Sequence, residues 1–320
     1  MQELFKMSDL GLLSYYLGIE VTQTIDSITL CQRSYAEKVL EVAGMDGCNA
    51  CQTPMECRLK LKKDDEAKAV DASLYRTVIG SMRYLVHTRP DITHAVGIVS
   101  GFMEKPTMTH WTAVKQILRY VRGTLNYGCC YKRGSSKAEL IGYSDNNHAG
   151  DVGYCKSTSG QIFFLGENPV SWTSQKQNIV AISSCEADYV AAAATTCQGL
   201  WLSRLLAEMR GEEEASSFKL LIDNKSAIAL AKNPVHHNRS KHIDIKIHFI
   251  RDCVETKEVQ IDHIGTDDQV ADALTKLLGR VKFIKLRQRF GVQIDHIGTD
   301  DQVADALTKV LGWVKFVKLR

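Results

Sequence analysis

Four acidic residues stand where they could act together on a phosphate ester. Asp145 and Asp223 each follow a short apolar stretch that reads as a β-strand, so each lies just past a strand end. Open α/β sheets place their ligands at the carboxyl ends of strands. Glu186 lies in the first turn of an expected helix, and Asp272 lies in the last expected helix. The four acids therefore come from separate elements of one predicted sheet.

A shared divalent cation is the chemistry that would make such a grouping favourable. Carboxylates a few ångströms apart repel one another and raise one another's pKa, and a bound cation removes this cost. Hard oxygen ligands suit Mg²⁺, and two ions about 3.5 to 4 Å apart can activate a water and stabilise the leaving oxygen of a phosphodiester. We therefore expect a site for two Mg²⁺ ions, with Mn²⁺ able to substitute.

Each acid also has an ordinary structural role open to it. Asp223 precedes Asn-Lys-Ser and could begin a helix, and Glu186 could close a capping box with Ser183. Asp145 could cap a turn, and Asp272 could be a surface acid on an amphipathic helix. Taken singly, the residues favour these roles, so the metal site depends on convergence.

The elements that must position these acids alternate along the second half of the chain. Apolar periodicity and turn residues predict strands at 139–143, 161–165, 170–173, 218–222 and 259–264, and helices at 183–209, 240–254 and from 267 onward. This order predicts an α/β fold with a mixed five-stranded sheet flanked by helices.

The region before this sheet is predicted to be mainly helical. Apolar residues recur at three- and four-residue spacing over 34–43, over 73–86 and from Thr109. Basic residues flank the last of these stripes; such a flank is usually solvated, although it could contact phosphates. The polar segment at 132–137 reads as a linker, which gives domains at 1–137 and 138–291.

Composition narrows the class of protein. The 320 residues suffice for about two domains, and a net charge of +3 does not by itself indicate a polyanion partner. No window holds the roughly 18 apolar residues of a membrane span, and the N-terminus lacks the apolar core of a signal peptide, so we expect a cytoplasmic or nuclear protein. The ten cysteines are expected to be free thiols; zinc at the Cys48–Cys51 pair is the lesser alternative, because the spacing to other cysteines is irregular.

A duplicated tail ends the chain. Residues 259–287 recur at 292–320 with replacements only at positions 277, 280 and 284. A single extra copy is unlike a solenoid, which needs at least three units. We expect the first copy to dock beside the sheet and the second, with His296 and Asp305, to be loosely held. Exchange of the tail between two molecules is the alternative.

Seven motifs, in order, give the second region a resemblance to a known family. They are YSDNNHAGD, KSTSGQIFFLG, VSWTSQKQ, SSCEADYVA, LLIDNKSAI, HHNRSKHIDIKIHFIRD and QVADALTK. Together they resemble the ribonuclease H domain of copia-type retrotransposon Pol polyproteins. Upstream, FKMSDLGLLSYYLGIEV and LYRTVIGSMRYLVHTRPDI resemble the end of the reverse transcriptase and the connection after it. The paired-aspartate motif of the polymerase would precede Met1, so we expect no DNA synthesis by this chain.

The resemblance implies a magnesium-dependent endonuclease that cuts the RNA strand of RNA/DNA hybrids. It places the four catalytic and metal-ligating acids at Asp145, Glu186, Asp223 and Asp272. Asp244, in KHIDIK, competes with Asp272 for the fourth position.

The same resemblance suggests residues that handle the substrate. His263 would help product leave, as an imidazole that titrates near neutrality can. Hybrid recognition would use phosphate contacts and the RNA 2′-hydroxyl, with candidates Gln175, Lys176, Ser184, Asn224, Arg239 and Lys241.

Three positions depart from the family pattern. Asn147 and His148 stand where the family commonly has Asp-Trp, and Ile247 replaces a tyrosine. None of these changes removes an expected metal ligand. The alternative function is an inactive retrotransposon remnant that retains only nucleic-acid binding or its fold.

Overall fold

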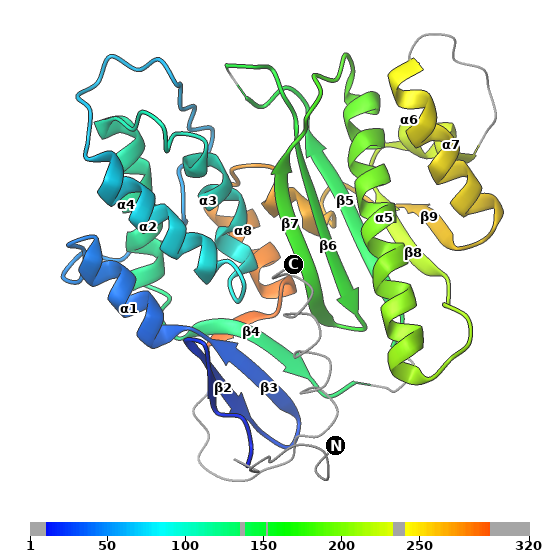
Figure 1. Cartoon of the computed structure of the whole chain (residues 1–320), viewed down its shortest axis with the longest axis horizontal. Coiled ribbons are helices and arrows are strands. Elements are labelled where there is room, and N and C mark those ends of the chain that lie inside the picture. The colour runs from blue at the N-terminus through cyan, green and yellow to red at the C-terminus, as the bar shows by residue number, and fades with distance from the viewer. Residues whose placement is uncertain (1–10, 135–137, 152, 233–240, 295–320) are drawn as a thin grey trace, which may run out of the picture.

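The second half of the chain builds one mixed β-sheet (Figure 1). The computed structural model describes residues 11–134, 138–151, 153–232 and 241–294, and among these it leaves the side chains of 241–247 and 293–294 aside. The strands are β5 (Leu140–Asn147), β6 (Thr158–Leu165), β7 (Asn168–Lys176), β8 (Phe218–Ile222) and β9 (Val259–His263), and they lie in the order β7-β6-β5-β8-β9.

This sheet combines an antiparallel meander with two parallel strands. β6 pairs antiparallel with β5 and β7, whereas β8 runs parallel to β5 and β9 runs parallel to β8. The connections are helical: α5 (Ser184–Arg210) joins β7 to β8, and α6 (Lys225–Lys232) and α7 (Lys241–Glu255) join β8 to β9. The mixed five-stranded sheet flanked by helices confirms the fold predicted from the sequence.

Helix α5 lies close to the sheet because small residues face it. Ala192 and Ala193 are buried in the core beneath the helix. A Cβ atom at Gly199 would lie 2.2 Å from the ring of Phe218 in β8, so only glycine permits this approach. The helix ends at Gly211, whose φ of 71° is the left-handed conformation of a common C-cap.

The preceding region contains helices and an antiparallel sheet. This is the first sheet along the chain, and the mixed sheet is the second sheet. Its helices are α1 (Arg33–Val42), α2 (Ala72–Leu85), the 3₁₀ turn η1 (Pro90–Ile92), α3 (Thr93–Ser100) and α4 (Met108–Arg122). Its strands are β1 (Tyr15–Tyr16), β2 (Ile19–Gln23), β3 (Ser27–Cys31), β4 (Tyr127–Lys132) and β10 (Val292–Ile294), all antiparallel in the order β1-β2-β3-β4-β10. The predicted helices are confirmed as α1, α2 and α4, but the sheet was not foreseen.

The end of the described chain joins the two regions. After β9 come the 3₁₀ turn η2 (Val270–Leu274) and α8 (Arg280–Arg289), where the sequence had predicted one helix from 267. Phe283 of α8 is buried in the core of the helical region. Leu286 and Phe290 are buried in a core cluster that draws on both sheets. The first copy of the duplicated tail thus forms β9, η2 and α8.

The second copy begins inside the other sheet. Its first three residues, Val292–Ile294, form β10 and pair with β4. The remainder, which includes His296 and Asp305, lies outside the described residues.

A buried ion pair between Arg89 and Asp91 stabilises the helical region. Both Nε and Nη2 of Arg89 donate to the Asp91 carboxylate, at 2.9 and 2.8 Å, and the Tyr120 hydroxyl donates to Asp91 Oδ2 at 2.6 Å. Arg287 of α8 donates to the Tyr120 hydroxyl at 3.2 Å. Burial favours the neutral acid, but the charge and hydrogen bonds of Arg89 outweigh it and hold the pKa of Asp91 below its ordinary value.

Candidate metal centre

Three carboxylates converge at one edge of the mixed sheet. Asp145 of β5, Asp188 of α5 and Asp223 after β8 each offer one oxygen, and these oxygens lie within 4.8 Å of one another. The parallel pairing of β5 with β8 brings Asp145 and Asp223 together, because Ser144 and Ile222 are partners in register. We call these three residues the acidic cluster. Several carboxylate oxygens at such spacing are the donor set that hard cations such as Mg²⁺ take.

Asp145 lies within a strand, not past its end as predicted, because β5 continues beyond it. Its partner in β6 is Gly160, where a Cβ atom would lie 2.6 Å from Cγ2 of Thr275. The absent side chain lets the segment after η2 approach β5. As a result, the Thr275 hydroxyl donates to Asp145 Oδ2, and Lys276 Nζ lies 3.2 Å from Asp145 Oδ1.

The structure brings Asp188, and not Glu186, into the acidic cluster. The backbone N–H of Glu186 donates to the Ser183 hydroxyl at 3.1 Å, and its carboxylate accepts from the backbone N–H of Ile182 at 2.9 Å. Glu186 therefore serves the helix N-terminus, the structural alternative that the Ser-x-x-Glu pattern had offered. The Ser-x-x-Glu pattern could have identified Asp188 from the sequence. Once Glu186 is assigned to the cap, Asp188 is the remaining acid in the first turns of α5.

Two asparagines hold Asp188. Nδ2 of Asn146 donates to Asp188 Oδ1, and Nδ2 of Asn224 donates to Oδ2 at 2.7 Å. Asn224 was predicted to bind substrate; its Oδ1 also accepts from Ser226 N at the start of α6, at 2.9 Å. The Oδ1 atom of Asn146 is buried without a hydrogen-bond partner. An unsatisfied buried oxygen beside carboxylates is consistent with a cation or its bound water at this place.

Burial raises the pKa of two acids of the acidic cluster, Asp145 and Asp188. It raises the pKa of Asp145 to about 7, with Asp272 and Asp223 adding to the shift while Lys276 and Thr275 oppose it. It also raises the pKa of Asp188 to about 6, against the hydrogen bonds from Asn224 and Asn146. The acids are thus incompletely compensated by the protein, and a bound cation would favour their ionised forms.

Asp272 lies beside the acidic cluster and is linked to it through a lysine. Its Oδ1 lies 2.6 Å from Lys276 Nζ, the same ammonium that contacts Asp145, and its Oδ2 accepts from Lys282. Asp272 was predicted to lie in the final helix, but it belongs to the 3₁₀ turn η2. The competing candidate, Asp244, lies in α7, where its side chain is outside those described.

The other predicted residues occupy varied positions. His263 is exposed at the end of β9, in register with Ile222, which precedes Asp223. Gln175 and Lys176 are exposed at the end of β7, and Lys176 pairs with Asp151 at 2.8 Å.

Two predicted substrate residues cannot be placed. Arg239 lies outside the described residues, and Lys241 begins α7 without a described side chain. Ser184 is exposed as the first residue of α5.

The positions that depart from the family pattern serve the local structure. Asn147 donates to the Thr275 carbonyl and accepts from the backbone N–H of Thr158, both at 2.8 Å. His148 Nε2 lies 3.3 Å from the Ala181 carbonyl oxygen. Asn147 thereby ties the segment after η2 to the strands that carry Asp145. The side chain of Ile247 is not among those described.

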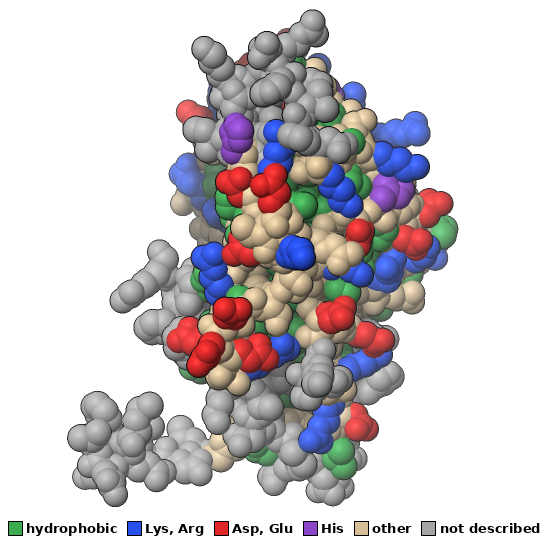
Figure 2. All heavy atoms as spheres, turned by 90° about the vertical axis from the view of Figure 1, so that its right-hand side faces the viewer, with side chains coloured by type: hydrophobic (Ala, Val, Ile, Leu, Met, Phe, Trp, Pro, Cys, Tyr) green, Lys and Arg blue, Asp and Glu red, His purple; other side chains and the backbone are tan. Residues whose placement is uncertain are grey.

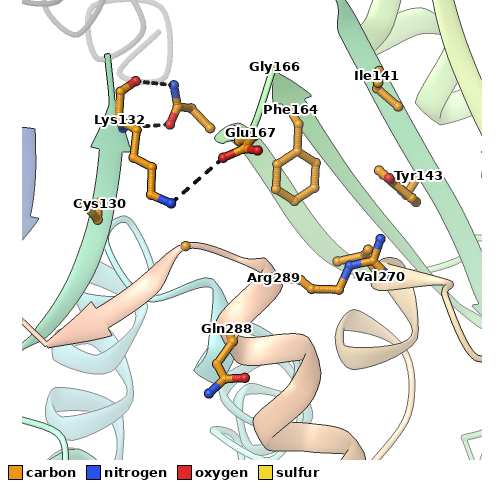
Figure 3. A pocket seen from close by; sticks show the side chains of 12 residues that line it. Cys130, Lys132, Ile141, Tyr143, Phe164, Gly166, Glu167, Val270, Gln288 and Arg289 are labelled. Carbon is orange, nitrogen blue, oxygen red and sulfur yellow. Dashed lines mark hydrogen bonds and ion pairs between the residues drawn. The ribbon is translucent and has the colours of Figure 1, made fainter. Parts of the chain in front are cut away.

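A pocket of about 380 Å³ lies elsewhere on the sheet, between β4, β5, β6 and α8 (Figure 3). Tyr143 and Phe164 line one side of it. Its charged groups already have partners: Lys132 lies 3.9 Å from Glu167, and Arg289 lies 3.4 Å from Asp268. None of the predicted catalytic residues lines this pocket, so the chemistry of the chain is not placed there.

Surface charge does not mark a path for nucleic acid on the face that Figure 2 shows. Acidic and basic side chains lie side by side there, over the side of the molecule that carries α6 and α7 (Figures 1 and 2). Among the helices of the described ranges, none is long and apolar enough to cross a membrane. The ten cysteines are free thiols, and Cys51 donates to the Thr53 carbonyl.

The strand order and helical connections are those of the ribonuclease H-like fold expected from the sequence. A family model described as reverse transcriptase (RNA-dependent DNA polymerase) matches residues 1–57. The chain is 40% identical over 280 residues to the retrovirus-related Pol polyprotein from transposon RE2 of Arabidopsis thaliana, covering 88% of this chain and 19% of that protein. It is 38% identical over 297 residues to that from transposon TNT 1-94 of Nicotiana tabacum, covering 90% and 22%.

The chain is homologous to copia-type retrotransposon Pol polyproteins over most of its length, and it spans about a fifth of the length of these relatives. Among solved structures, the N-terminal ribonuclease H domain of a Mycobacterium tuberculosis protein matches with a TM-score of 0.33 and 12% identity, covering 48% of this chain and 98% of that one. A foamy viral protease-reverse transcriptase in complex with double-stranded DNA matches with a TM-score of 0.44 and 11% identity, covering 79% and 44%.

Proposed function

We propose that this chain is a metal-dependent ribonuclease H, an endonuclease that hydrolyses the RNA strand of RNA/DNA hybrids. The observation that carries the proposal is the acidic cluster, in which oxygens of three carboxylates from separate elements lie within 4.8 Å. The homology of the chain to retrotransposon Pol polyproteins supports a nucleic-acid substrate.

The residues of the acidic cluster fit a divalent cation. Asp145, Asp188 and Asp223 would hold it, and Asn146 offers the unsatisfied oxygen beside them. Mg²⁺, or Mn²⁺ in its place, would supply a polarised water and stabilise the leaving oxygen of the phosphodiester when a pair of ions is bound. Asp272 is the candidate for a fourth acid.

The chain's own side chains prepare the acids for this role. Asn146 and Asn224 fix both oxygens of Asp188, and the Thr275 hydroxyl fixes one oxygen of Asp145. Such partners orient ligands before a cation binds and typically change metal affinity or activity by about 10- to 100-fold when removed.

Recognition of the hybrid would depend on its backbone and shape. Phosphate and 2′-hydroxyl contacts carry little sequence information, so we expect cleavage with low sequence preference. Ser184, Gln175 and Lys176 are exposed, which is compatible with such contacts. His263 pairs in register with Ile222, the residue before Asp223, and this supports a role for its imidazole in product release.

The test is cleavage of a labelled RNA/DNA hybrid by the whole purified chain with Mg²⁺ or Mn²⁺. Asp145→Asn and Asp188→Asn should each lower the rate by at least about 100-fold, beyond the effect of removing an outer-shell partner. Glu186→Gln is the matched control, because its carboxylate serves the helix cap. Equal cleavage by the wild type and Asp145→Asn would refute the proposed site. Hybrid binding without cleavage in either metal would indicate an inactive remnant.

A further inference from the structure

Lys276 lies where a cation is needed. Its Nζ is 3.2 Å from Asp145 Oδ1 and 2.6 Å from Asp272 Oδ1. Both carboxylate side chains are only 2% exposed, so neither has enough water around it to offset its charge. The backbone N–H of Lys276 donates to the Asp272 carbonyl at 2.9 Å, which holds the root of the side chain beside both acids. One ammonium therefore serves two buried carboxylates.

We propose that Lys276 is a tethered counter-cation of the acidic cluster, and that a divalent cation must displace its ammonium from Asp145 in order to bind there. The inference rests on the metal site proposed above and concerns how that site is controlled. Both oxygens of Asp145 are engaged, Oδ1 by Lys276 and Oδ2 by Thr275. A hydroxyl can remain beside a metal-bound carboxylate, but an ammonium and a metal ion repel each other.

The ammonium is able to leave. The Lys276 side chain is 38% exposed, and a lysine charge sits on a flexible four-carbon stem that can turn into solvent. Asp272 would keep a positive partner, because Lys282 contacts its other oxygen. Displacement of Lys276 therefore leaves only Asp145 without a positive partner, and the incoming cation would neutralise its charge.

The two roles of Lys276 are linked thermodynamically. Methionine has a similar length to lysine and no charge. Its introduction at position 276 leaves the negative charge of the metal-free cluster less compensated, and it removes the ammonium that competes with a divalent cation for Asp145. The metal-free protein should become less stable, and the affinity for a divalent cation should rise, because binding and stability share one free-energy cycle. We expect Mn²⁺ to bind about 5- to 150-fold more tightly, the usual range for coupled sites.

The experiment is a calorimetric titration of the whole chain with Mn²⁺ at fixed pH and ionic strength. Lys276→Met should bind more tightly than the wild type, and Lys276→Arg, which keeps the charge, should bind like the wild type. Lys285→Met is the matched control, because Lys285 lies 3.9 Å from Asp268 and is exposed. Wild-type binding with no gain in Lys276→Met would refute the counter-cation alone.

Other outcomes separate this inference from the proposed function. Absence of Mn²⁺ binding in both the wild type and Lys276→Met would refute the metal site as well as the counter-cation. Binding by Lys276→Met alone would support the counter-cation.

Thermal unfolding of the same variants gives a second measurement. With a chelator, Lys276→Met should melt below the wild type, and saturating Mn²⁺ should narrow the difference. A difference of the same size with and without metal would indicate a merely structural lysine and refute the inference. If Lys276→Met does not fold, Lys276→Gln takes its place.

Discussion

Two aspartates, each 2% exposed, meet opposite electrostatic surroundings in the two regions of the molecule. Asp91 accepts two hydrogen bonds from Arg89 and one from Tyr120, and its pKa lies below the ordinary value. Asp145 has a hydroxyl and a half-exposed lysine beside it, together with other acids, and burial raises its pKa to about 7. The first arrangement is complete without a ligand, whereas the second leaves negative charge that a bound cation would neutralise.

The difference lies in the partner as much as in the acid. The Arg89 side chain is 4% exposed, and its planar group meets the carboxylate with two parallel hydrogen bonds, a geometry that a guanidinium holds rigidly. The ammonium of Lys276 is a point charge on a long stem and is divided between two acids. A strongly shifted pKa beside incomplete compensation is a feature of functional sites.

The largest expected effect tests the complete site. Arg89→Met should lower the free energy of unfolding by about 3–5 kcal/mol, because it leaves the Asp91 charge buried without its partner. Denaturant unfolding measures this. Lys132→Met is the control, since Lys132 and Glu167 form an exposed pair worth about 0–1 kcal/mol. Similar losses of unfolding free energy in Arg89→Met and Lys132→Met would contradict the view that Asp91 depends on Arg89.

A pH series tests the incomplete site. The folded pKa of Asp145 is above its unfolded value, so the folded state binds the extra proton and the wild type loses stability as pH rises from about 4 to 7. In Asp145→Asn the free energy of unfolding should fall less over this pH range. The difference from the wild type should be no more than about 4 kcal/mol, because the pKa of Asp145 is raised by about three units and one unit corresponds to about 1.4 kcal/mol. Unfolding measured with a chelator at several pH values shows it. A decline as steep in the variant would place the titration elsewhere.

Gly160 permits the close approach that the acidic cluster requires. Gly160→Ala would put a methyl group 2.6 Å from Thr275 Cγ2 and 2.8 Å from Leu274 Cβ, which should cost about 1–3 kcal/mol and reduce hybrid cleavage. Gly80→Ala in α2 has nothing within 4 Å of the new methyl and should stabilise by about 1 kcal/mol. Denaturant unfolding of both variants compares them. Undiminished stability in Gly160→Ala would mean that η2 can shift freely.

The smallest effect concerns the start of α5. Ser183→Ala should cost about 1 kcal/mol, the usual value of an N-cap, while hybrid cleavage persists at stabilities where the chain stays folded. Thermal unfolding and the cleavage assay are compared in one preparation. Loss of cleavage in fully folded Ser183→Ala would show that this end of α5 does more than support the helix.

The second sheet was predictable because its pattern is local. The apolar stretches that became β8 and β9 and the alanine-rich stretch of α5 each determine one element by their own periodicity. The first sheet was missed because β4 and β10 join β2 and β3 from far along the chain. Pairing over such separations leaves no local signal.

The site was predicted in part. Strand ends pointed to Asp145 and Asp223, but the choice between Glu186 and Asp188 depends on the side of the helix that faces the cluster. At 3.6 residues per turn, these two positions point about 160° apart around the helix axis. The role of Lys276 was not predicted, because nothing in the local sequence shows that its ammonium reaches Asp145, 131 residues away in the chain.

The order of synthesis gives β10 a further significance. β4 pairs with β3 on one side and with β10 on the other, so the first sheet has its fifth strand only after Ile294 has been made. Until then, the outer edge of β4 carries unpaired backbone groups while the whole second sheet is being translated. A nascent chain halted before α8 would hold an open strand edge of the kind that attracts other chains. Completion of the first region therefore waits for the second.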